Sequence, residues 1–112
     1  MTNSIADVIN DKTDLFFMIG SNPDTSHPTI GLRIHQALDK GKAKLVVVDP
    51  RKTPTATTLA DIHLQVRPGT TAALASGMMN VIFREGLHDQ SFCEKWIYGF
   101  EELKEYVRAY TP

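Results

Sequence analysis

Two runs of consecutive apolar residues constrain the fold of this chain more than any other feature of its sequence. Residues 15–19 are five apolar residues closed by Gly20, and residues 45–48 are four apolar residues closed by Asp49. Such runs, without polar alternation, are typical of strands that are buried on both faces of a parallel sheet. We therefore expect both segments to be central strands.

A third strand is predicted where Ile62, Leu64 and Val66 alternate with polar residues, a pattern typical of a strand with one lightly covered face near the edge of a sheet. Apolar residues at helical spacing predict helices in residues 4–12, 28–40 and 71–85, a short helix in 55–60, and two short helices after residue 90. Strands that alternate with helices imply right-handed crossovers. The expected fold class is α/β, a Rossmann-like parallel sheet of about three strands flanked by helices.

Composition limits the class of protein. The chain has 112 residues, 12 Lys and Arg against 13 Asp and Glu, and 42% apolar residues, which fits one globular domain over residues 1–112. Its scattered charges do not form the basic patch of a nucleic-acid-binding protein, and no apolar run approaches the roughly 20 residues of a membrane span. Without a signal peptide pattern, a cytoplasmic location is expected. One cysteine cannot supply an iron–sulfur cluster or a cysteine-based zinc site.

Three polar loops follow the three predicted strands, in residues 20–28, 49–53 and 67–71. Parallel sheets bind ligands beyond the carboxyl ends of their strands, so these loops are expected to meet on one rim. The first loop opens a helix and offers hydroxyl and amide groups that suit a phosphate, although the same residues can simply shape a turn and cap the helix. The sequence contains neither a G-x-G-x-x-G fingerprint nor a P-loop.

The second loop carries a more specific signal. Asp49 ends the second strand, where dinucleotide-binding folds hold ribose hydroxyls, and Arg51 can bind a phosphate through two nitrogens or pair with Asp49. The alternative is an Asp-Pro turn followed by a solvated arginine. The four histidines show no metal-ligand spacing and are expected at surface or capping positions, and Cys93 is expected to pack. The residues therefore indicate a nucleotide-like ligand, with no catalytic residue and no metal ligand.

Five motifs, in order, resemble the molybdopterin-guanine-dinucleotide-dependent oxidoreductases, which include formate dehydrogenases and nitrate reductases. They are Met1-Thr2-Asn3-Ser4-Ile5, Gly20-Ser21-Asn22-Pro23 with His27-Pro28, Val47-Val48-Asp49-Pro50-Arg51, Ala60-Asp61-Ile62-His63-Leu64 and Arg67-Pro68-Gly69-Thr70. The resemblance covers essentially the whole chain. It implies part of a Rossmann-like domain that grips the guanosine diphosphate end of the molybdopterin guanine dinucleotide.

The resemblance also implies which residues contact this cofactor. Asn22, Thr25 and Ser26 would lie near the diphosphate or ribose, and Asp49 and Arg51, with the backbone at Val48, would line the nucleoside pocket. Gly69 and Thr71 would close the pocket from the third loop. Members of the family often have an acidic residue at the position of Thr25 and Asp or Asn at that of Thr71.

The resemblance further implies that the chain is an internal piece of a larger enzyme, most similar to a formate dehydrogenase. The molybdenum or tungsten and the iron–sulfur cluster would be held by other parts of that enzyme, so the piece alone is expected to be inactive. Its partners would be the remaining domains, or a second copy paired through the edge near residues 62–64. The alternative function is a structural or interaction module without a pterin, as in the related large subunit of respiratory complex I.

Overall fold

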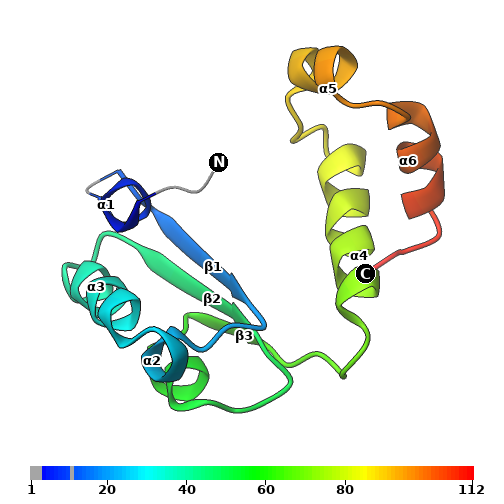
Figure 1. The fold of residues 1–112 in the computed structure, drawn as a ribbon. Helices are drawn as coiled ribbons and strands as arrows, with labels where there is room; N and C mark the ends of the chain where they lie inside the picture. Colours follow the sequence, from blue (N-terminus) through cyan, green and yellow to red (C-terminus); the bar gives the residue numbers. More distant parts are fainter. Residues whose placement is uncertain (1–3, 11) are drawn as a thin grey trace. The chain divides into compact units, whose positions relative to one another are not determined.

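The computed structural model describes residues 4–10 and 12–112, and the chain divides into two compact units, Met1–Val66 and Arg67–Pro112 (Figure 1). The first three residues of the motif Met1-Thr2-Asn3-Ser4-Ile5 lie outside the described residues.

The first unit contains a parallel sheet of three strands, β1 (Leu15–Ile19), β2 (Lys44–Val48) and β3 (Ile62–Leu64), in the order β1-β2-β3. Ile19 lies opposite Val48, and Val48 lies opposite Leu64, so the three strands end side by side. This confirms the predicted α/β fold class and the central position of β2. The loops that follow β1 and β2 consequently begin at neighbouring points on one edge of the sheet.

Four helical segments accompany the sheet: α1 (Ile5–Val8), α2 (Pro23–Ser26), α3 (Pro28–Asp39) and the π-helix η1 (Thr55–Leu59). Proline stands at the first position of both α2 and α3, where its missing N–H leaves no hydrogen bond unmade. The chain leaves α3 through Gly41, whose positive φ of 69° explains why glycine ends this helix. The first helix is shorter than the predicted 4–12.

The core of this unit lies on one face of the sheet. Phe16, Leu45 and Val47 point to this face and are buried against Ile34 of α3 and Ala56 of η1. Because both crossovers run in the same direction along the sheet, right-handed connections bring α3 and η1 to the same face. On the opposite face Val48 is also buried, whereas the side chains of β1 that point to this face are exposed.

The expectation that β1 is a central strand buried on both faces is wrong. It is an edge strand, and Leu15, Phe17 and Ile19 are 52%, 39% and 47% exposed. Ile62 of β3 is exposed on the same face of the sheet. An uninterrupted apolar run indicates that both faces of a strand can be buried. It does not determine which elements cover those faces.

The second unit is helical, with α4 (Thr71–Arg84), α5 (Gln90–Trp96) and α6 (Phe100–Val107), which confirms the helix after residue 70 and the two short helices of the tail. Phe83 meets His88 and Phe100 edge to face, with ring centroids 5.4 and 5.5 Å apart, and Val107 is fully buried. Asp89 caps α5 by accepting a hydrogen bond of 2.9 Å from the Phe92 N–H. None of the described helices combines the length and the apolar character needed to cross a bilayer.

Candidate functional site: a polar pocket after two strands

An open pocket of about 370 Å³ lies where the loops after β1 and β2 meet. Every lining residue is polar or glycine: Gly20, Ser21, Asn22, Thr25, Ser26 and Arg51. This is the carboxyl edge of the parallel sheet, where open α/β folds bind ligands. The pocket therefore stands where the sequence predicted a binding site.

The loop after β1 is shaped by its own backbone contacts. Gly20 adopts a positive φ of 57°, and its N–H donates to the Val48 carbonyl at 2.9 Å, which extends the pairing of β1 and β2 into the loop. The N–H and hydroxyl groups of Ser26 both donate to the Asn22 carbonyl at 3.0 Å. The Asn22 Oδ1 atom is buried and has no hydrogen-bond partner among the described residues. A buried acceptor of this kind is uncommon in folded proteins and suits a donor supplied by a ligand.

The loop after β2 is built around a buried carboxylate. Asp49 is 1% exposed, and its Oδ1 accepts hydrogen bonds from the Arg51 backbone N–H at 2.7 Å and from Arg51 Nε at 3.3 Å. Its Oδ2 accepts from Arg51 Nη2 at 3.4 Å. The hydrogen bonds from Arg51 hold the pKa of Asp49 below its usual value, so the carboxylate is ionised. The Arg51 side chain, 70% exposed, is thereby held at the rim of the pocket.

Strand β3 fixes the backbone of this second loop. His63 Nε2 lies 2.9 Å from the Asp49 carbonyl, and Gln65 Nε2 donates to the Pro50 carbonyl at 3.0 Å. Because a carbonyl only accepts, His63 Nε2 carries the proton in this contact. Sequence reasoning expected surface or capping roles for the histidines and missed this one. The sequence carried no signal for it, because the alternation of residues 62–66 assigns His63 to the polar face, whereas in the structure it pairs with Val47 on the core face and Ile62 is exposed.

The structure places the predicted contact residues in three groups. Asn22, Thr25, Ser26 and Arg51 line the pocket together. Val48 and Asp49 are buried next to it and contribute through their hydrogen bonds to Gly20 and Arg51. Gly69, with a φ of 84°, and Thr71, the first residue of α4, belong to the second unit.

The pocket is suited to recognising an anion with hydroxyl groups. Arg51 supplies a permanent cation, and Ser21, Thr25 and Ser26 supply hydroxyls that can donate or accept. In the described part of the chain, no three His, Cys, Asp or Glu side chains are grouped as they would need to be to hold a metal ion. The arrangement can bind and orient a phosphorylated ligand.

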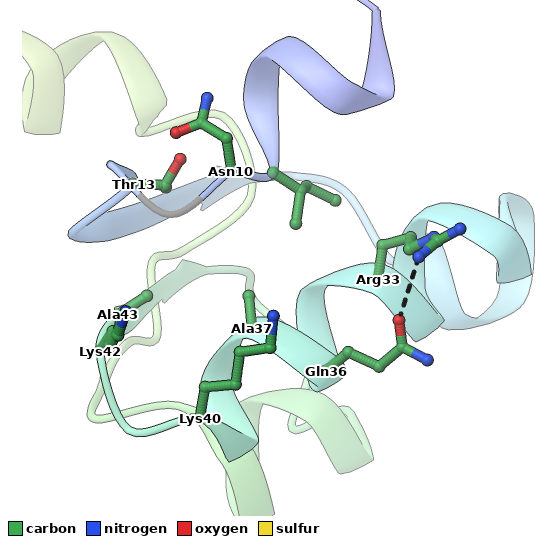
Figure 2. A pocket seen from close by; sticks show the side chains of 9 residues that line it. Asn10, Thr13, Arg33, Gln36, Ala37, Lys40, Lys42 and Ala43 are labelled. Carbon is green, nitrogen blue, oxygen red and sulfur yellow. Dashed lines mark hydrogen bonds between the residues drawn. The ribbon is translucent and has the colours of Figure 1, made fainter.

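A second pocket, of about 100 Å³, lies by the turns that lead into β1 and β2 (Figure 2). Its basic residues are Arg33, Lys40 and Lys42, and Arg33 Nη1 donates to Gln36 Oε1 at 3.5 Å. Since it lies before the strands rather than after them, it is separate from the polar pocket. It supplies matched control positions for experiments there.

Comparison with known proteins identifies the family. The family model described as molybdopterin oxidoreductase matches residues 1–105. The chain is 49% identical over its full length to the F420-dependent formate dehydrogenase subunit alpha of Methanocaldococcus jannaschii, and 41% identical over its full length to formate dehydrogenase H of Escherichia coli. It spans only 16% and 15% of the lengths of these two relatives.

A solved structure shows the same fold. The acetylene hydratase from Pelobacter acetylenicus matches 96% of this chain with a TM-score of 0.74 and 42% sequence identity, and the match covers 14% of that protein. With a family model over residues 1–105 and relatives above 40% identity along the whole chain, the chain belongs to the molybdopterin oxidoreductase family.

Proposed function

We propose that this chain is part of the dinucleotide-binding domain of a larger molybdopterin oxidoreductase, and that its polar pocket binds the guanosine diphosphate end of a molybdopterin guanine dinucleotide. The observation that carries the proposal is the meeting of Arg51 with Thr25 and Ser26 in one pocket at the carboxyl edge of the sheet, lined also by Asn22, whose buried Oδ1 has no hydrogen-bond partner among the described residues. The residues fit such a group, because a diphosphate needs a cation and hydroxyl donors, while ribose and guanine supply donors for a buried acceptor.

Each side chain then has a distinct role. Arg51 binds the diphosphate, and Thr25 donates a hydroxyl hydrogen bond to it. Ser26, whose hydroxyl donates to the Asn22 carbonyl, lies beside the diphosphate or ribose, and Asn22 accepts a hydrogen bond from the ribose or the base. Asp49 holds Arg51 through both carboxylate oxygens. It also accepts a ribose or guanine donor when the guanidinium turns toward the diphosphate.

The activity belongs to the larger subunit. Its relatives named formate dehydrogenases support formate as the substrate, with molybdenum or tungsten and an iron–sulfur cluster held outside this chain. The metal bound by the pterin supplies the electron-transfer chemistry when the cofactor is present. This chain contributes binding and orientation of the nucleotide end, and its partners are the other domains of that subunit.

Titration calorimetry with guanosine diphosphate tests the binding role. We expect saturable binding that Arg51→Leu weakens about tenfold or more, because a hydrogen bond to a charged group contributes about 1.5–3 kcal/mol. Arg33→Leu removes another exposed arginine, from the other pocket, and is the matched control. Adenosine diphosphate in place of guanosine diphosphate tests recognition of the base.

Two outcomes would count against the proposal. Absence of heat at millimolar guanosine diphosphate would favour the alternative of a structural module without a pterin. Equal binding by Arg51→Leu and by the unsubstituted chain would show that any nucleotide binds outside this pocket.

A further inference from the structure

Asp24, in the middle of α2, is in contact with two other elements of the first unit. The Thr55 hydroxyl, at the start of η1, donates a hydrogen bond to Asp24 Oδ2. On the other side, His35 Nε2 of α3 lies 3.0 Å from Asp24 Oδ1, although the angles are not those of a hydrogen bond. One carboxylate therefore connects α2 with η1 and with α3.

The neighbouring helix is shaped to admit this carboxylate. A Cβ atom on Gly31 of α3 would collide with Asp24 Oδ1 and would lie 3.2 Å from the Asp24 backbone nitrogen and Cα. Gly31 does not have a positive φ, so its conformation does not call for glycine. Glycine in a helix interior costs about 0.5–1 kcal/mol relative to alanine, so its presence here is explained by the close approach of Asp24.

The contact with Thr55 joins the two walls of the polar pocket. Asp24 directly precedes Thr25 and Ser26, which line the first wall. Thr55 follows Arg51, the residue of the second wall, by four positions, and is 5% exposed. A partly buried hydrogen bond between residues 31 positions apart holds one wall against the other.

We infer that Asp24 is a positioning residue: through Thr55 it sets the distance between the loop bearing Thr25 and Ser26 and the loop bearing Arg51. The inference rests on the proposed binding of a nucleoside diphosphate in this pocket. Asp24 itself does not line the pocket, but it would determine how far apart the phosphate-binding groups lie. His35 and Gly31 act on the same carboxylate from α3.

Thr55→Val removes the hydroxyl and keeps the shape of the side chain, whereas Thr55→Ser keeps the hydroxyl. Thr57→Val is the matched control, because the Thr57 hydroxyl is within the same turn and donates only to the Thr53 and Pro54 carbonyls. We expect Thr55→Val to weaken guanosine diphosphate binding by roughly three- to tenfold, with Thr55→Ser and Thr57→Val close to the unsubstituted chain. Amide chemical shifts should change on both walls, at Thr25 and Ser26 as well as at Arg51, in Thr55→Val alone.

The amide shifts separate this inference from the proposed function. If the unsubstituted chain does not bind guanosine diphosphate, the proposed function fails, and shift changes on both walls in Thr55→Val still support the coupling. Shift changes confined to the neighbours of Thr55 would overturn it, as would an unchanged affinity in a Thr55→Val chain whose melting temperature has fallen.

Gly31→Ala gives an independent test from the other side of Asp24. The added methyl group displaces the carboxylate, so Gly31→Ala should reproduce the shift changes at Ser26 and Arg51. Combined with Thr55→Val it should add little, since both changes break the same contact. Fully additive effects on affinity would show that Gly31 and Thr55 act through different groups. That result would overturn the inference that both act through Asp24.

Discussion

Among single residues, Asp49 makes the clearest electrostatic prediction. Hydrogen bonds from Arg51 lower its pKa in the folded chain below the unfolded value of about 3.9. A carboxylate with a depressed folded pKa contributes stability above the unfolded pKa, and this contribution is lost as the pH falls through the folded pKa. We therefore expect Asp49→Asn to lower the free energy of unfolding at pH 7 and to make its acid dependence below about pH 4 less steep. Urea unfolding at a series of pH values measures both effects.

The control for this change is Asp39→Asn, which removes an exposed carboxylate from the end of α3. Asp61 and Asp89 also have lowered pKa values, from Lys44 and from the Phe92 N–H, so the chain will retain some acid dependence in every variant. The prediction concerns the difference between variants. The prediction would be contradicted if the free energy of unfolding fell equally steeply with pH below about pH 4 in Asp49→Asn and in the unsubstituted chain.

A second single-residue prediction concerns the helix cap at Asp89. Its Oδ1 accepts from the Phe92 N–H and from the Ser91 hydroxyl, both at 2.9 Å. Replacing an N-cap carboxylate by alanine costs about 0.5–2 kcal/mol, so Asp89→Ala should destabilise the chain by that amount. Asp89→Ser retains a capping oxygen, so it should lower the free energy of unfolding by only a small part of the loss expected for Asp89→Ala. Equal loss in both variants, measured by denaturant unfolding, would show that the cap is not what Asp89 provides.

Sequence reasoning could find the residues whose role follows from their place on one element. Asn22, Asp49 and Arg51 were predicted because polar residues directly after a buried strand stand at the binding edge of a parallel sheet. His63, Asp24 and Thr55 were missed because their partners are 14 and 31 positions away in sequence. Which side chains meet across such distances depends on the register and the crossing of elements, which local patterns do not specify.

At the scale of elements, β2 is the strand on which the first unit depends most. Leu45 is fully buried in the middle of the core and points to the face covered by α3 and η1. Truncating a buried leucine to alanine removes contact area and leaves a cavity, at a cost of about 2–5 kcal/mol. Leu45→Ala should therefore destabilise the unit by several kcal/mol. Leu32→Ala, on the exposed side of α3, should change the stability by less than about 0.5 kcal/mol.

Denaturant unfolding with equal m-values in both variants measures this difference. A small effect of Leu45→Ala would mean that β2 is not central to the core.

The same strand shows what the sequence pattern of an element can and cannot establish. Continuous apolar residues correctly predicted β2 as central, but the same pattern in β1 predicted a central strand where the structure has an edge. The two strands differ in their neighbours rather than in their composition.

At the scale of the molecule, one face of the sheet in the first unit carries exposed apolar side chains. Leu15, Phe17 and Ile19 are on this face with Ile62, and β1 leaves an unpaired edge beside them. Exposed apolar patches next to a free strand edge mark surfaces that pair with further chain or with another molecule. Val48 shares this face and is buried, so the exposed apolar surface is confined to β1 and Ile62.

The isolated chain should therefore self-associate through this face, rather than through the β3 edge alone as the sequence suggested. Sedimentation velocity from micromolar to millimolar concentration should show reversible association, because burying these side chains releases about 25 cal/mol for each Å² of apolar surface. Phe17→Thr with Ile19→Thr keeps strand-forming residues and removes the apolar surface, so the double variant should remain monomeric. Leu32→Thr removes a leucine that is 59% exposed on α3 and should associate like the unsubstituted chain. Association that persists unchanged in the double variant would place the contact elsewhere, because the open face would then contribute no apolar area to it.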